Sequence, residues 1–109
     1  VLATVSAGCL TGYNAGQLVI HNEENQEQTV TIEWANRSTT LTVAPESKRA
    51  ITLTDSPGNY TVEATVDGTT TLNQTIEYYA AGPDGNKPGG GVLWLHIGPE
   101  RTQFMISHD

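Results

Sequence analysis

The most reactive side chain in the sequence belongs to its single cysteine, Cys9, which follows a short run of small and apolar residues. Residues 1–8 read VLATVSAG. A secretory signal ends in such a segment, because the processing enzyme needs an extended, unbranched chain at the cut. The predicted chemistry is lipid attachment to Cys9. We therefore expect a residual signal segment over residues 1–9, a short linker over 10–16 and one folded domain over 17–109. The alternative is that residues 1–7 form an ordinary strand and that Cys9 is a buried thiol.

Three Asn-x-Ser/Thr sequences could accept an N-linked glycan, and none has proline in the middle. The acceptor residues are Asn36, Asn59 and Asn73. Asn36 and Asn59 fall in expected turns, and Asn73 alternates with the apolar Leu72, so it should point to solvent. A glycan needs such exposed positions. Glycosylation at one or more of the three is therefore a prediction that depends on export.

Small exported β-proteins often hold copper through two histidines, a cysteine and a methionine. The residues that could supply such ligands are His21, His96, His108, Met105 and Cys9. A blue-copper thiolate lies close in sequence to a histidine and to the methionine, whereas Cys9 stands at the opposite end of the sequence from Met105. We therefore expect surface histidines, with no metal site and no cofactor.

Other candidate sites are weak. Asp84 and Asn86 could offer oxygen ligands to calcium, but a solvated glycine-rich loop is the favoured interpretation. The serines lie in expected turns or near an end, and no Gly-x-Ser-x-Gly elbow occurs, so we predict no catalytic site and no enzymatic activity. Trp94 falls in the outward phase of its segment and could bind a sugar or a protein partner. Packing against the sheet is the alternative role for Trp94.

Composition limits the possible partners. Twelve acidic residues face five basic ones, and the formal net charge is −7. This balance opposes binding to nucleic acid or anionic lipid, so contact with a membrane would have to come through the anchor. An acidic, lysine-poor surface also suits a high-salt environment. With one cysteine, no disulfide can form within the chain, and the fold must depend on packing.

The elements that must position these residues are strands, because apolar residues recur at alternate positions and threonine is abundant. Residues 21–25 are expected to form a polar turn, Asp67-Gly68 a type I′ hairpin, and residues 80–91 an irregular loop. Tyr60 is expected to act as a tyrosine corner, with its hydroxyl returning to the backbone near Asp55. The expected strands cover residues 17–22, 27–35, 39–43, 49–54, 60–66, 70–79, 92–97 and 102–107.

Seven or eight short strands imply two packed sheets, because a single sheet of this size would leave one apolar face wet. We therefore predict an all-β, immunoglobulin-like or fibronectin-like antiparallel sandwich. The residues expected to form the core are Leu18, Ile20, Val30, Ile32, Trp34, Leu41, Val43, Ile51, Leu53, Tyr60, Val62, Val66, Leu72, Ile76, Leu93, Leu95, Ile97 and Phe104.

Ser6-Ala7-Gly8-Cys9 resembles the cleavage box of lipoproteins, and the longer run from Leu2 to Gly12 is similar to the surface lipoproteins of halophilic archaea. The segments LTVAPE and PGNYTV also resemble the paired pattern of many surface immunoglobulin-like domains. The resemblance implies an extracellular, membrane-anchored archaeal glycoprotein that acts as a structural or binding module of the cell surface. Its partner would be an unknown surface protein or glycan, and self-association is allowed.

Two alternatives stay open. Residues 1–8 alternate small and apolar side chains, so they could remain on the chain and insert as a donor strand into a neighbouring copy, which would make the protein a filament subunit. A weaker alternative is a small exported metal-binding protein.

Overall fold

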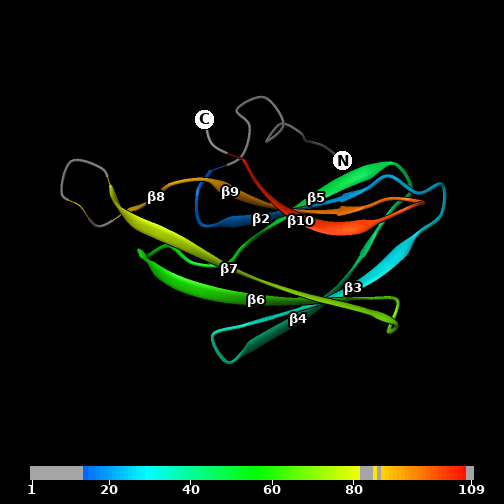
Figure 1. Ribbon diagram of the computed structural model, residues 1–109, viewed down its shortest axis with the longest axis horizontal. Coiled ribbons are helices and arrows are strands. Elements are labelled where there is room, and N and C mark those ends of the chain that lie inside the picture. Colours follow the sequence, from blue (N-terminus) through cyan, green and yellow to red (C-terminus); the bar gives the residue numbers. More distant parts are fainter. Residues whose placement is uncertain (1–13, 82–84, 86, 108–109) are drawn as a thin grey trace.

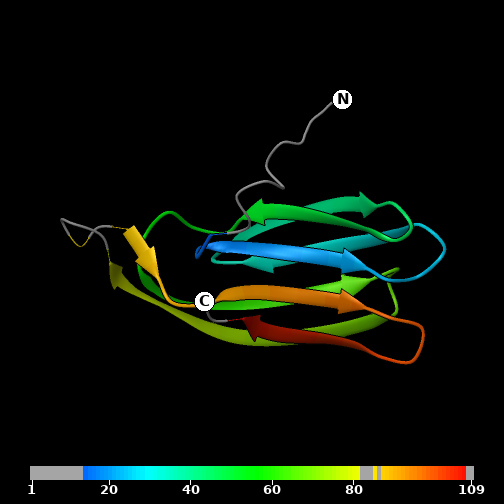
Figure 2. The same cartoon turned by 90° about the horizontal axis from the view of Figure 1, so that it is seen from above.

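The computed structural model describes residues 14–81, 85 and 87–107, and this part of the chain is all β-structure. It contains nine strands in two layers that pack face to face (Figures 1 and 2). Among these residues there is no helix long and apolar enough to cross a membrane. The strands are β2 (Gln17–Asn22), β3 (Gln28–Trp34), β4 (Arg37–Val43), β5 (Ser47–Thr52), β6 (Gly58–Val66), β7 (Thr70–Ala81), β8 (Lys87–Gly89), β9 (Val92–Ile97) and β10 (Thr102–Ser107).

One layer is a four-stranded sheet in the order β10-β9-β2-β5, and the other is a five-stranded sheet in the order β4-β3-β6-β7-β8. The chain crosses between the layers after β2, β4, β5 and β8. Neighbouring strands are antiparallel except β2 and β9, which pair in parallel with Leu18 opposite Leu93 and Asn22 opposite Ile97. The predicted β-sandwich is confirmed, whereas the purely antiparallel arrangement is wrong at this one pairing.

The core lies between the sheets and follows the alternation of apolar and polar residues, although the outward Val19 of β2 is buried as well. In β3, for example, Val30, Ile32 and Trp34 are buried, whereas Thr29 and Glu33 are exposed. One face of β3 therefore meets the other sheet and the opposite face meets water. Every expected core residue lies in this cluster or packs against it, and those that are only partly buried are Ile51, Tyr60, Leu72 and Phe104.

Two tight hairpins close the five-stranded sheet. Asp67 and Gly68, between β6 and β7, both have positive φ (53° and 72°), as the predicted type I′ turn requires. Ala35 and Asn36, between β3 and β4, also have positive φ (47° and 62°). Because this second turn takes only two residues, β4 begins at Arg37 instead of residue 39.

The prediction of an irregular loop over residues 80–91 is wrong for residues 80–81 and 87–89, which lie in strands. β7 continues to Ala81, and β8 pairs with it, with Ala81 opposite Lys87 and Tyr79 opposite Gly89. A Cβ atom at Gly89 would lie 2.7 Å from the Cβ of Ala81, so glycine is needed for this close approach. Pro88 is tolerated because β8 is an edge strand, where a missing N–H breaks no inner ladder.

The predicted return of the Tyr60 hydroxyl to the backbone is confirmed. It donates to the carbonyl of Ser56 at 3.1 Å and lies 2.8 Å from Oγ1 of Thr54. This contact fixes the corner at which the chain passes from β5 in one sheet to β6 in the other.

Candidate functional site

The outer face of the β10-β9-β2-β5 sheet carries two rows of side chains in register across its strands. We call this surface the histidine face. The first row is Lys48, His21, His96 and Gln103, and the second is Ala50, Val19, Trp94 and Met105. Residues in register on neighbouring strands project to the same side of a sheet, so each row forms a line of adjacent side chains.

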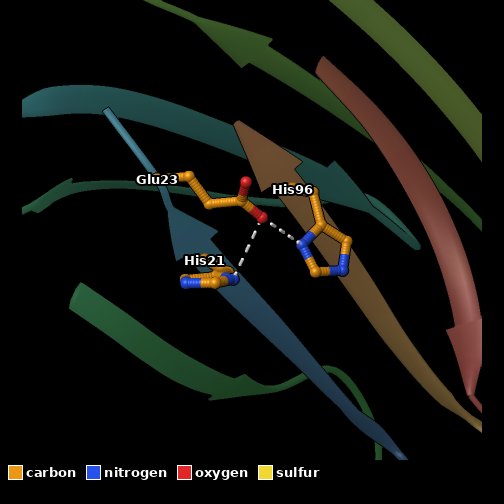
Figure 3. A group of neighbouring side chains, drawn as sticks. All are labelled: His21, Glu23 and His96. Atoms are coloured by element: carbon orange, nitrogen blue, oxygen red, sulfur yellow. Dashed lines mark hydrogen bonds and ion pairs between the residues drawn. The ribbon is translucent and has the colours of Figure 1, made fainter. Parts of the chain in front are cut away.

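Three polar side chains converge on this face (Figure 3). His21 on β2 and His96 on β9 stand directly opposite each other in the parallel pair, and their ring centroids are 5.4 Å apart. Oε2 of Glu23 lies 3.3 Å from Nδ1 of His21 and 3.1 Å from Nδ1 of His96. One carboxylate oxygen therefore sits between two imidazole rings.

The backbone holds all three residues in place. Both histidines lie within strands, and Glu23 follows the last residue of β2. The N–H of Glu23 donates to the carbonyl of Ile97 at 2.8 Å, which ties the start of the turn to the end of β9. The backbone of Glu23 is thus held against the end of the sheet.

The charge state of His21 reflects its position in the sheet. Burial lowers the pKa of His21, and this effect outweighs the Glu23 carboxylate, which raises it. Lys48 and His96 lower the pKa further. Since the ordinary value is 6.5, the ring of His21 is mainly neutral at pH 7.

Trp94 lies on the outer face, in the phase that the alternation predicts, and is half-buried. Its ring stacks on His96 with a centroid separation of 5.7 Å and an interplanar angle of 7°. Nζ of Lys48 lies 6.0 Å from the centre of the Trp94 ring. Lys48 therefore reaches from β5 across β2, and Val19, which lies on β2 between them, is fully buried despite its outward direction.

Two shallow hollows flank His96. One, of about 370 Å³, is lined by Glu23, Arg101, Gln103 and Met105 among others. The second, of about 330 Å³, is lined mainly by apolar atoms from Trp94, Met105 and their neighbours. Met105 is half-exposed, and its Sδ lies 3.7 Å from Nε2 of Gln103. The histidine face thus offers both polar and apolar contact area.

The opposite outer face, on the five-stranded sheet, has a different character. A row of four threonines crosses it in register: Thr40, Thr31, Thr65 and Thr71. Hydroxyl groups in this row pair at 3.0 Å and 3.2 Å. Threonine pairs of this kind stabilise a sheet.

The three glycan acceptors are all exposed on the five-stranded sheet. Asn36 lies in the hairpin turn between β3 and β4, as expected. Asn59 lies within β6 and not in a turn, where it stands opposite Glu77. Asn73 lies on β7 opposite Glu63. Each position leaves space for a glycan, and modification stays a prediction.

Sequence reasoning missed the convergence of His21, Glu23 and His96. The expected strand over residues 17–22 is confirmed as β2, whereas the expected turn over residues 21–25 is wrong at His21 and Asn22, which are the last two residues of that strand. The available signal was the alternation of Leu18 and Ile20, which continues outward to His21. No local signal brings β2 beside β9. Cys9, His108, Asp84 and Asn86 lie outside the described residues, so the predictions made for them are unchanged.

No family model matches the chain, and no significant match was found among the curated proteins or the solved structures that were compared with it.

Proposed function

We propose that this protein is a non-enzymatic binding module of the cell surface, anchored through a lipid on Cys9, that meets its partner with the histidine face. The observation that carries the proposal is the contrast between the two outer faces. One presents Trp94, Met105 and two histidines beside two hollows, whereas the other presents a row of hydroxyl-paired threonines together with the exposed Tyr79 on β7. Tryptophan, tyrosine and methionine are enriched where proteins bind partners.

The net charge of −7 favours a protein or glycan partner over a nucleic acid. A glycan or a protein could occupy the apolar hollow that Trp94 and Met105 line. Either partner would use the same surface.

We further propose an immunoglobulin-like architecture in the broad sense. The two packed sheets and the hydroxyl of Tyr60, which donates to the backbone four residues earlier, support this likeness. The strand order does not reproduce the A-B-E-D and C-F-G sheets of a seven-stranded constant domain, so the likeness concerns architecture and not topology.

Oxidative footprinting can test the binding face. Hydroxyl radicals would be generated on intact native cells and on the purified protein, and side-chain oxidation would be read by mass spectrometry. We expect Trp94 and Met105 to be protected on cells. Tyr79, which is 60% exposed on β7, should be oxidised equally in both samples. Equal oxidation of Trp94 and Met105 in both samples would contradict the proposed face.

The intact mass of the native protein tests the anchor separately. We expect a lipidated chain that starts at Cys9, with any glycan at Asn36, Asn59 or Asn73 visible as added mass. An unmodified chain that keeps Val1 would instead support the donor-strand filament. Release by detergent and not by salt should accompany lipidation, because an acyl chain buries its apolar surface in the bilayer.

A further inference from the structure

The cluster of His21, Glu23 and His96 has the donor types and the separations of a metal site. Two imidazole nitrogens and a carboxylate oxygen are ligands that zinc and related ions favour. The three potential ligand atoms lie within 4.8 Å of one another. Bonds of about 2.0–2.1 Å around a tetrahedral ion place neighbouring ligand atoms about 3.3 Å apart. The two separations from Oε2 of Glu23, 3.1 Å and 3.3 Å, already match this spacing.

Access and rigidity also favour a ligand. The side chains of His21 and His96 are 27% and 25% exposed, and that of Glu23 is 44% exposed, so an ion can reach all three from solvent. The parallel pairing of β2 and β9 fixes the backbone that carries the two histidines, and the bond from the N–H of Glu23 to the carbonyl of Ile97 fixes the backbone of Glu23. The three side chains point toward one another (Figure 3). A site on strands needs little reorganisation to bind.

We propose that the histidine face binds one divalent transition-metal ion of the zinc type through Nδ1 of His21, Nδ1 of His96 and the carboxylate of Glu23. Three protein ligands leave at least one coordination position open toward solvent. A donor atom of the surface partner, such as a carboxylate or an imidazole, can complete the coordination there. This inference deepens the proposed function, because it names a ligand for the same face, but it does not depend on the lipid anchor.

Zinc titration of the purified full-length chain tests the site. Isothermal calorimetry with zinc chloride should give one ion per chain. In NMR spectra, the first equivalent should shift the ring protons of His21 and His96. Copper(II) and nickel(II) should compete with zinc, whereas calcium, which prefers oxygen ligands, should not.

Single substitutions show whether these three side chains are the ligands. His21→Gln, Glu23→Gln and His96→Gln should each weaken zinc binding at least tenfold. Glu24→Gln removes the same charge from the adjacent residue and should leave the affinity unchanged, because Glu24 is not part of the cluster. Thermal unfolding of each variant in the absence of metal provides the folding control.

The proposal is overturned if wild-type protein shows neither heat nor histidine shifts with millimolar zinc. It is also overturned if zinc binds but all three substitutions leave the affinity intact. If one variant does not fold, the zinc-induced shifts of the His21 and His96 ring protons in the wild-type protein still show whether these residues bind the ion. If zinc does not bind, protection of Trp94 and Met105 on cells still tests the binding face by a separate measurement, so the two proposals can fail separately.

Discussion

Ionisation of the buried Tyr78 hydroxyl should destabilise the folded state. Its side chain is 1% exposed, and its hydroxyl donates to the carbonyl of Gln17 at 3.4 Å. Burial raises the pKa of Tyr78 to about 12 from an ordinary value of 10. Because the folded value is the higher one, Tyr78 stabilises the fold fully below pH 10 and loses this contribution between pH 10 and 12. The loss is about 2–3 kcal/mol.

We predict that Tyr78→Phe makes the free energy of unfolding less sensitive to pH across this window, because phenylalanine cannot ionise. Urea denaturation at pH 8.5 and pH 11.5 measures the effect. Tyr79→Phe serves as the control, since Tyr79 is the next residue on β7 and is 60% exposed. If the free energy of unfolding of both variants falls as much as that of the wild type between pH 8.5 and pH 11.5, ionisation of the buried Tyr78 does not cause the fall.

At the residue level, alternation predicts which apolar side chains are buried, but it does not predict the buried polar ones. Leu18 and Ile20 were expected in the core and are there. Asn22 is 0% exposed and Gln28 is 4% exposed, although their types favour the surface. The burial of Asn22 depends on hydrogen-bond partners that lie far away in the sequence, such as the carbonyls of Val43 and Ala44.

At the level of strands, one pairing works against the five-stranded sheet. Glu33 on β3 stands directly opposite Glu63 on β6. Like charges in register destabilise a sheet. We predict that Glu63→Gln raises the free energy of unfolding by about 0.2–1 kcal/mol at low salt. The gain should vanish in 1 M NaCl, where charges are screened within about 3 Å.

Glu77→Gln is the matched control for this prediction. Glu77 lies on β7 in the same sheet and stands opposite the neutral Asn59. Both substitutions remove one negative charge from a protein of net charge −7, so any general effect of charge is common to both. Chemical denaturation in 20 mM and 1 M NaCl compares them, and an equal gain in the two variants would mean that the pair itself contributes nothing.

Strand prediction succeeded where the signal is local and failed where it is not. Asp67-Gly68 carries its own turn geometry, so the hairpin of β6 and β7 could be predicted from two residues. The parallel pairing of β2 with β9 joins segments from the two ends of the domain, and nothing near either strand specifies it. The candidate metal site depends on that pairing, which is why His21 and His96 looked like unrelated surface residues in the sequence.

On the scale of the whole molecule, hydrogen bonds connect the two sheets. They run from side chains of one sheet to the backbone of the other. Nε1 of Trp34 on β3 donates to the carbonyl of Leu53 at 2.8 Å, just past the end of β5. The hydroxyl of Tyr78 on β7 reaches Gln17 on β2. Nδ2 of Asn22 on β2 donates to Val43 on β4 at 3.2 Å and to Ala44 at 3.1 Å. These contacts fix how the sheets are placed in a chain that cannot form an internal disulfide.

Asn22 makes several hydrogen bonds at this junction, so replacing it tests whether such contacts hold the two sheets together. Its amide also donates to Gln26 at 2.8 Å, and its oxygen accepts the N–H of Glu24 at 2.9 Å. We predict that Asn22→Ala lowers the free energy of unfolding by about 2–4 kcal/mol, because the carbonyl of Val43 and the N–H of Glu24 lose partners at a buried position. Asn25→Ala, in the exposed turn that follows, should change it by less than about 0.5 kcal/mol. Urea denaturation at pH 7 distinguishes the two, and equal effects would show that the asparagine does not fasten the layers.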